Sequence, residues 1–363
     1  MLTVSLVFFI FGSLPLLVQK YYGDWIYPII ATDLRFIFYF YPFPAGELIY
    51  CMYTLSFLGA FYSIISKGIK KDMIGLQIAS IRFINLTLSS YVLFELFWGL
   101  NYSRPPIHQQ LNIPYTKYTQ DELIALTRFF IQRSDSLEKL IDFKPRYGPK
   151  PEQKRYTLKA LRDDAAAAYA ENPSGSRLFV YKIPSIKPGF LFLSQFGIEG
   201  YYNPFTGEAQ VNLDLPEWIL PFVTCHEIAH QQGIAREDEA NLIGYMAAAQ
   251  SSNVNFQYSA YYNMLHYLLY EVQVNAPERY EALFKTISPG VKQHFKEERA
   301  FWEENNIMMS RYLNIAFDNF LKFNGQSKGI ESYRDIVIWL WNMHKKDIHS
   351  TLQPVNNNTP QKS

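Results

Sequence analysis

The first hundred residues contain three long apolar runs, and these constrain the fold more than any other feature of the chain. They lie at positions 2–19, 48–66 and 73–100. The first two carry no charged side chain, and the third is interrupted by Arg82 and Glu95. A helix rises about 1.5 Å per residue, so roughly 20 apolar residues cross the hydrocarbon layer of a bilayer. We therefore expect three transmembrane helices in the first hundred residues.

The first run fits either a retained span or a cleaved secretory signal peptide. A signal peptide needs a positively charged start and a small-x-small cleavage site. Residues 2–19 lack the charged start, and no such cleavage site follows them. We therefore favour a retained span.

The loop after the second run carries Lys67, Lys70 and Lys71. Short loops rich in lysine stay in the cytoplasm. Three spans would then place residues 20–47, and the chain after residue 100, on the outer side of the membrane. Residues 20–47 are rich in Tyr, Phe and Trp, which is typical of a re-entrant or surface-lying segment at the membrane interface.

The chain becomes polar and periodic after residue 100, and we expect one extracytoplasmic domain over residues 101–349. Thr119 and Glu122 have the spacing of a capping box, which predicts a helix to about residue 141. A second helix is predicted for the alanine-rich residues 156–171.

The pattern changes between residues 177 and 215, where apolar and polar side chains alternate. Alternation is typical of strands, so we expect one or two short strands and a small sheet. Residues 255–345 return to helical periodicity, and residues 350–363 are predicted to be a disordered tail. The fold class that follows is mainly α: three transmembrane helices, then an α+β domain with a small sheet and a helical C-terminal part.

Residues His226, Glu227 and His230 form the pattern His-Glu-x-x-His. Residues four apart lie on nearly the same face of a helix, so both histidines can bind one metal ion. Glu227 is offset by about 100° around the axis, which keeps it off the ion but within reach of a water bound there. Zinc lowers the pKa of such a water toward ~7, and a neighbouring carboxylate can take its proton during attack on a carbonyl. The alternative is a helix with two surface histidines, and the apolar run WILPFVT before the motif argues against it.

Two acids, Glu237 and Glu239, compete for the place of the third ligand. We expect Gly233 to end the motif helix and a second helix to start near residue 236. Glu237 and Asn241 are four apart and share a face of that second helix, whereas Glu239 points about 200° away from Glu237. Asn241 can then hold a ligand histidine while Glu237 binds the ion. This favours Glu237, with Glu239 as the alternative.

Charge and cysteine content exclude two classes of protein. The formal net charge is +1, which argues against a nucleic-acid partner. Cys51 and Cys225 are the only cysteines and stand far apart, which argues against a disulfide framework. Cys225 points about a quarter-turn away from the histidine face, so we expect a small buried hydrophobe rather than a ligand.

The sequence Glu237-x-x-Ala240-Asn241 is similar to the Glu-x-x-Ala/Ser-Asp element of gluzincin metallopeptidases, the thermolysin-like and membrane-bound kinds included. Two departures are visible: Asn stands where Asp is usual, and the gap between the second histidine and the glutamate is shorter. The resemblance implies one Zn²⁺ ion with His226, His230 and Glu237 as ligands, Glu227 as general base, and Asn241 as the residue that orients a ligand histidine.

Over nearly its full length the chain also resembles an uncharacterised bacterial membrane-protein family, catalogued as domain of unknown function 3810. The resemblance runs through WGLNYSRPP, GIEGYYNPFTGEAQVN, LPFVTCHEIAHQQGIAREDEAN and NFLKFNGQSKGIESY. It implies a membrane-anchored, zinc-dependent protein. Together with the lysine cluster, this leads us to expect an integral protein of the bacterial inner membrane, with its zincin-like domain on the periplasmic or extracellular side.

In zincin peptidases a strand at the edge of the cleft pairs with the extended substrate backbone. Residues 207–212 directly precede the motif helix. We expect Glu208, Ala209 and Gln210 to bind substrate there, with an ordinary core strand as the alternative. The candidate donors to the transition-state oxyanion, chosen for their proximity in sequence, are Tyr201, Tyr202 and Tyr245.

Two functions from different classes fit these features. The first is a membrane-anchored zinc metallopeptidase that acts on a peptide or protein of the cell envelope. The second is a non-catalytic membrane scaffold or sensor with a structural metal site. A structural site has no use for a general base, so Glu227 favours the peptidase. Four protein ligands, with Cys225 or Glu239 among them, would favour the scaffold.

Overall fold

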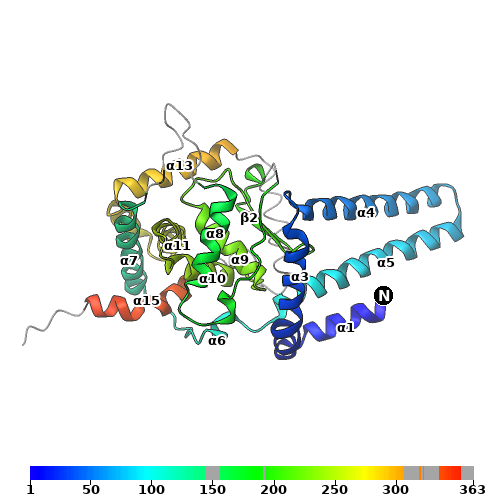
Figure 1. The fold of residues 1–363 in the computed structure, drawn as a ribbon, viewed down its shortest axis with the longest axis horizontal. Coiled ribbons are helices and arrows are strands. Elements are labelled where there is room, and N and C mark those ends of the chain that lie inside the picture. Colours follow the sequence, from blue (N-terminus) through cyan, green and yellow to red (C-terminus); the bar gives the residue numbers. More distant parts are fainter. Residues whose placement is uncertain are drawn as a thin grey trace, which may run out of the picture.

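The structure is a computed structural model, and it describes residues 1–141, 143, 156–190, 193–305, 319, 322 and 335–352. Most of these residues are helical, and one small sheet of three strands lies among the helices (Figure 1). The expectation of a mainly helical chain with a small sheet is therefore confirmed. Part of the predicted helical region 255–345, and residues 353–363 of the predicted tail, lie outside the described residues. The prediction that the tail begins at residue 350 is wrong, because residues 350–352 still belong to the last helix.

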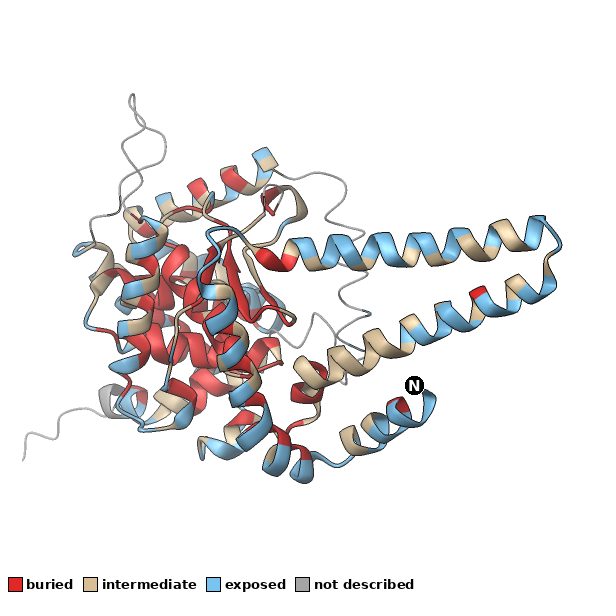
Figure 2. Ribbon diagram, turned by 45° about the vertical axis from the view of Figure 1, so that its right-hand side comes forward, coloured by how far each residue is buried: buried red, intermediate tan, exposed pale blue. Residues whose placement is uncertain are grey.

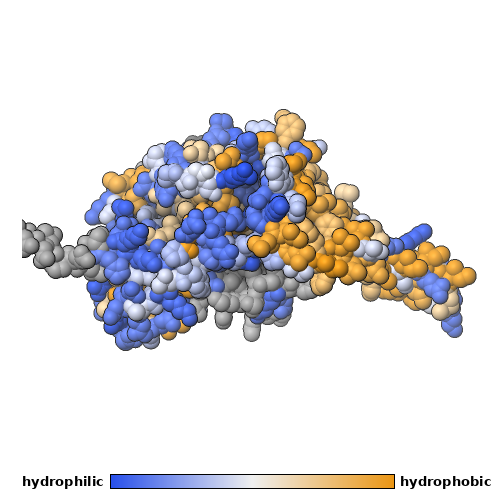
Figure 3. All heavy atoms as spheres, turned by 90° about the horizontal axis from the view of Figure 1, so that it is seen from below, coloured by the Kyte–Doolittle hydropathy of each residue, from blue (hydrophilic) through white to orange (hydrophobic). Residues whose placement is uncertain are grey.

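A long helical hairpin projects from the domain (Figure 1). It consists of α4 (Ala45–Ile69) and α5 (Met73–Phe97), each of 25 residues. Both helices are apolar; α4 is largely exposed, whereas α5 is exposed toward the turn and half-buried toward the domain (Figures 2 and 3). Both are long and apolar enough to cross a membrane. In the turn between them, the Asp72 carboxylate accepts from the Gly75 amide and pairs with Lys67. The second and third predicted spans thus form one antiparallel pair.

The first apolar run does not form one straight helix. Helix α1 (Leu2–Gly12) ends before α2 (Pro15–Leu17), and the chain continues through the π-helix η1 (Val18–Ile26) into α3 (Tyr27–Tyr39). Proline has no N–H to donate and its ring clashes with the preceding turn, so the helix breaks before Pro15. The chain bends there by 96°. A third span is present only if this bent pair counts as one.

The remaining helices form the domain. The predicted capping box is present at the start of α7: Thr119 Oγ1 accepts from the Glu122 amide, and the Glu122 carboxylate accepts from the Thr119 amide. The bounds are η2 Gly99–Ser103, α6 Ile107–Gln110, α7 Gln120–Glu138, α8 Leu158–Ala170, η3 Arg177–Phe179, η4 Ser194–Phe196, α11 Val254–Asn275, α12 Pro277–Lys285, α13 Pro289–Asn305 and α15 Ile336–Leu352.

The sheet has the strand order β1-β3-β2. Strand β3 (Glu208–Val211) pairs in parallel with β1 (Ile186–Pro188) and antiparallel with β2 (Gly200–Asn203). Because β3 is hydrogen-bonded on both sides, the expectation that residues 207–212 form an exposed edge strand is wrong. The register places Ile186 opposite Ala209, and Tyr201 opposite Gln210.

The three residues predicted to bind substrate, Glu208, Ala209 and Gln210, are fully buried. The Glu208 carboxylate accepts from the first two amides of α4, Ala45 N at 3.1 Å and Gly46 N at 2.9 Å. A negative charge is favoured at this end of a helix. Gln210 also donates to a side chain of α4. Their assignment to substrate binding is therefore wrong: β3 attaches the hairpin to the domain.

The centre of the domain is the helix pair α9 (Leu220–Gln231) and α10 (Glu237–Ala249), in which nearly every residue is buried (Figure 2). The turn between them contains Gly233 at a φ of 86°, which glycine adopts without strain. The two helices are in close contact at Gly244, where a Cβ would lie 2.9 Å from the backbone N of His226. The predicted break of the motif helix at Gly233 is therefore present.

We predict that His294 on α13 makes the stability of the domain acid-sensitive. Its ring stacks on Trp218 with centroids 4.2 Å apart, and its Nδ1 accepts from the Tyr258 hydroxyl. Burial lowers the pKa of His294 from 6.5 to about 4. Between these pH values the unfolded chain binds a proton that the folded chain does not, so the free energy of unfolding falls as the pH drops from 7 to 4. Since the ring is only partly buried, we expect a loss of roughly 2 kcal/mol or less.

Thermal unfolding in detergent between pH 7 and pH 4 checks this prediction. The melting temperature of wild type should fall more steeply with acid than that of His294→Gln, which keeps a polar side chain but does not titrate. His349→Gln, at an exposed histidine of α15, is the matched control. Identical slopes for wild type and His294→Gln would contradict the prediction.

Candidate metal centre

Helix α9 presents His226 and His230 on one face, with their Nε2 atoms 3.1 Å apart. Helix α10 begins at Glu237, whose Oε2 lies 3.3 Å from His226 Nε2 and 3.6 Å from His230 Nε2. Ligand atoms that sit about 2.0–2.1 Å from a tetrahedral ion are about 3.3–3.4 Å apart. The three donor atoms therefore have nearly the spacing that a zinc ion requires.

Of the two competing acids, only Glu237 reaches the histidines. Glu239 Oε1 accepts from the Ile107 amide at 2.9 Å and from Arg236 Nη1 at 3.4 Å. These contacts hold it about 200° around α10 from Glu237, as the helix phase predicts. Within the part of the chain that the structure describes, the group able to hold a metal ion consists of Glu237 and the two histidines, whose donor atoms lie within 4.8 Å of one another.

Each histidine is fixed through its Nδ1 atom. His230 Nδ1 lies 2.7 Å from the Ile234 carbonyl oxygen, which can only accept, so this Nδ1 carries the hydrogen. His226 Nδ1 lies 2.9 Å from Asn241 Oδ1. Asn241 thus occupies the position expected of it, one turn beyond Glu237. With both Nδ1 atoms donating, both Nε2 atoms direct a lone pair toward the same point.

Two lone pairs and a carboxylate that face one point repel one another unless a proton or a metal cation lies between them. Burial disfavours the charged form of His230, yet the Glu237 carboxylate raises the pKa of this histidine to about 9. Burial also opposes ionisation of Glu237, but the two histidines hold the pKa of that carboxyl well below its usual range. A divalent ion satisfies all three groups at once and competes with protons for them. The nitrogen and oxygen donors are of the types that zinc prefers.

Glu227 lies beside this group and is not part of it. It is buried, and its Oε2 has no hydrogen-bond partner among the described residues. Its Oε1 lies against Gly200, where a Cβ would come within 2.8 Å of that oxygen. Burial raises the pKa of Glu227 to about 8. A buried carboxylate without a partner is costly to maintain and well suited to accept a proton.

The structure adds two residues that sequence reasoning missed. Tyr267 on α11 accepts a hydrogen bond from Asn241 Nδ2 at 3.3 Å, which leaves its own O–H free to donate. Gly200 opens β2 and lets this strand lie directly on Glu227. No spacing links Tyr267 to the motif, and a single glycine in a turn-rich segment gives no signal of a close approach.

The tyrosines chosen for their proximity in sequence have other contacts. The Tyr202 hydroxyl lies 3.3 Å from the Tyr27 hydroxyl of α3. The Tyr245 hydroxyl lies 2.8 Å from His344 Nε2 on α15. Tyr201 lies on β2, opposite Gln210. Proximity in sequence therefore did not select the tyrosine that contacts Asn241.

Cys225 is a buried free thiol. Burial raises the pKa of this thiol well above its usual range, which keeps it protonated. A thiol binds zinc as the thiolate, so its surroundings disfavour a role as ligand.

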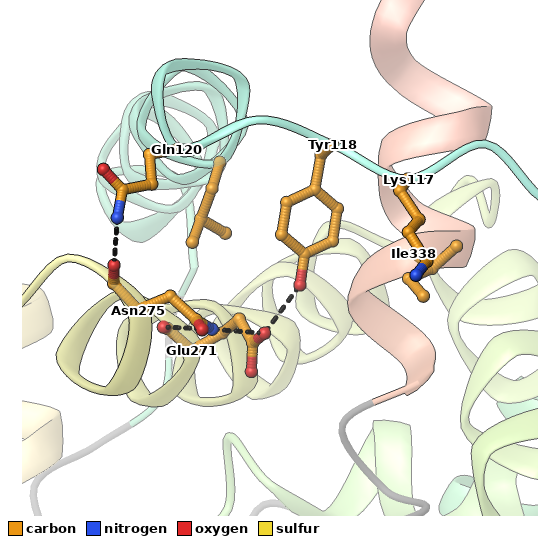
Figure 4. A pocket seen from close by; sticks show the side chains of 7 residues that line it. Lys117, Tyr118, Gln120, Glu271, Asn275 and Ile338 are labelled. Carbon is orange, nitrogen blue, oxygen red and sulfur yellow. Dashed lines mark hydrogen bonds between the residues drawn. The ribbon is translucent and has the colours of Figure 1, made fainter.

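A surface cavity of about 410 Å³ lies apart from the histidines, between the start of α7, the end of α11 and α15 (Figure 4). Its polar side chains bind one another. Glu271 accepts from the Tyr118 hydroxyl and from Asn275 Nδ2, and Gln120 donates to the Asn275 carbonyl. These contacts stabilise the packing of α7 on α11, and we assign no chemistry to this cavity.

A family model described as "Protein of unknown function (DUF3810)" matches residues 22–341. The match covers the hairpin, the sheet and every residue of the candidate metal centre. No curated protein and no solved structure matches the chain. Because the family model spans most of the sequence, the chain belongs to the DUF3810 family.

Proposed function

We propose that this chain is a membrane-anchored zinc metallopeptidase of the His-Glu-x-x-His type, with a gluzincin-like motif in a zincin-like domain. One observation carries the proposal. Three donor atoms converge with nearly the spacing of a zinc site, and beside them lies the buried Glu227, whose Oε2 has no hydrogen-bond partner among the described residues. Structural zinc sites use four protein ligands, whereas catalytic sites use three and keep a position open.

Each residue of the centre would have its own role in peptide hydrolysis. A zinc ion held by His226, His230 and Glu237 would supply a Lewis acid that polarises a peptide carbonyl and acidifies water. Glu227 accepts a proton from the water as that water attacks the carbonyl carbon. It then passes the proton to the leaving amine as the C–N bond breaks. Asn241, through its contact with His226, keeps the lone pair of that histidine directed at the ion.

Strand β2, at the edge of the sheet, takes over the substrate-binding role first given to β3. An extended peptide paired with the outer side of β2 would run past Gly200. Its carbonyl groups would then lie beside Glu227, which contacts that glycine.

We further propose that the domain lies on the periplasmic or extracellular side of the bacterial inner membrane, where its substrates are peptides or proteins of the cell envelope. The lysine cluster in the hairpin turn supports this orientation. The scaffold or sensor alternative would gain support from a fourth protein ligand. Among the described residues, Glu239 and Cys225 have other surroundings.

We predict that Glu237→Ala abolishes zinc binding. The variant removes one of three ligands, whereas the matched variant Glu239→Ala removes an acid whose contacts are Ile107 and Arg236. Metal analysis of the purified proteins should give about one zinc per chain for wild type and for Glu239→Ala, and little for Glu237→Ala. Equal zinc in wild type and Glu237→Ala would show that the third ligand is wrongly assigned. Melting temperatures separate loss of metal from loss of folding.

We predict that Glu227→Gln retains zinc and loses peptide hydrolysis. The amide fills the same space against Gly200 but cannot accept the proton of the attacking water. General base catalysis typically contributes about 10²–10⁴-fold, so hydrolysis of fluorescently labelled casein should fall by at least about 100-fold. Glu303→Gln, at an exposed acid of α13, is the matched control. Wild-type hydrolysis by a zinc-loaded Glu227→Gln protein would overturn the mechanism.

A further inference from the structure

Helix α3 and the base of the hairpin contact the end of α9 that carries His230. The Tyr27 hydroxyl of α3 donates to the His230 carbonyl at 3.2 Å, and Arg35 Nη1 donates to the Gln231 carbonyl at 2.9 Å. Trp98, at the C-terminal end of α5, lies edge-on to the His230 ring with centroids 5.9 Å apart. One layer of side chains therefore separates the candidate metal centre from α3 and from the base of the hairpin.

The two faces of α3 differ in an unusual way. Tyr27, Ala31 and Arg35 follow one another at intervals of four and are buried toward the domain. The opposite face is apolar although it is exposed: Ile29 and Phe36 lie seven residues apart on one side of α3. Trp25, near the end of η1, and Phe40, directly after α3, extend this stripe. Their exposed fractions are 69% for Trp25, 60% for Ile29, 56% for Phe36 and 70% for Phe40.

This apolar stripe continues the hydrophobic surface of the hairpin. Helix α3 lies crosswise to α4 and α5, at the end of the hairpin that joins the domain (Figure 1). Hydrophobic side chains extend from the hairpin onto the adjoining side of the domain (Figure 3). If α4 and α5 cross the bilayer, a helix perpendicular to them at this end lies in the plane of the membrane surface. Asp33 is the one exposed charge on α3 and suits the level of the lipid headgroups.

We propose that α3 rests on the bilayer surface, and that the metal centre cleaves peptides anchored in the same bilayer, in the segment next to their anchor. Packed helices lie about 8–10 Å apart, and the histidine side chains add a few ångströms more. The site is therefore about 10–20 Å from the apolar layer. An extended chain advances about 3.3–3.6 Å per residue, so the cut falls about three to six residues from the anchor. This choice of substrate rests on the proposed peptidase activity, whereas the placement of α3 does not.

Spin labels test the placement of α3 in full-length protein in liposomes. We would replace the exposed Cys51 by serine, keep the buried Cys225, and introduce Phe36→Cys or Phe40→Cys. Leu140→Cys, at a domain residue that is 67% exposed, is the control. The α3 labels should be accessible to oxygen dissolved in lipid and shielded from a water-soluble nickel reagent, and the control should show the reverse. Labels on α3 that resemble the control, or that are shielded from both reagents by a covering protein, would overturn the placement.

The position of the cuts along a membrane-anchored polypeptide tests the proposed choice of substrate. The probe is a flexible polypeptide of identical repeats, each with apolar, basic and acidic residues, that ends in an apolar helix of about 20 residues. The same polypeptide without this anchor is the comparison. Mass spectrometry of the fragments should place the cuts within the first repeat beside the anchor, and the anchored probe should be cut at least about tenfold faster. Phe36→Ser with Phe40→Ser should spread the cuts along the repeats, and Leu140→Ser should not.

The outcomes separate this proposal from the one on which it rests. Cuts spread evenly along the anchored probe, or equal rates for both probes, would overturn the choice of substrate and leave the peptidase activity standing. No cleavage of either probe by zinc-loaded protein would contradict the peptidase activity and the choice of substrate together. The spin-label result decides the position of α3 in either case.

Discussion

The close contact of α9 with α10 at Gly244 is the constraint on which the candidate site depends. The backbone of His226 lies where a side chain at position 244 would have to go. Together with the tight turn at Gly233, this contact folds α10 back along α9, so that Glu237 reaches both histidines. A shift of a few tenths of an ångström between the helices would matter, because zinc–ligand distances vary by only about 0.2 Å. Glycine is therefore required at position 244, although this position contributes no metal ligand.

The arrangement of much of this centre could be predicted, because it depends on the spacing of residues that are close together in the sequence. The shared face of the two histidines, the position of Glu227 beside them and the reach of Glu237 rather than Glu239 follow from helical periodicity, which holds once the break at Gly233 is recognised. The long apolar helices α4 and α5 and the capping box of α7 are equally local patterns. The place of β2 at the sheet edge and the role of Glu208 could not be predicted in this way, because both depend on contacts between separate segments. Strand order depends on how the three strands pair, and the partners of Glu208 on α4 lie about 160 residues away in sequence. Tyr267 was missed for the same reason, and the bend before Pro15 was missed because hydropathy alone does not register a helix break.

The joint that connects α3 and the hairpin to the domain is built from buried polar groups. Arg35 and Lys187 donate to backbone carbonyls at the ends of α9 and α3, and Glu208 accepts from the first amides of α4. Helix ends carry unsatisfied carbonyls and amides, so each of these side chains meets a group that needs a partner. These bonds satisfy backbone carbonyls and amides that would be costly to bury without a partner.

Such a joint resists bending. Separating the hairpin from the sheet would leave the first amides of α4 without their partner and Glu208 with Thr206 alone. Buried polar groups left unpaired cost about 1–3 kcal/mol each. Moving α3 away from α9 would have the same effect on Arg35 and on the carbonyl of Gln231. The depth of the hairpin in a bilayer would therefore fix the height of the histidines above it. Since Tyr27 and Trp98 contact His230 itself, the membrane-proximal segments would form one wall of the metal centre and would not act merely as its tether.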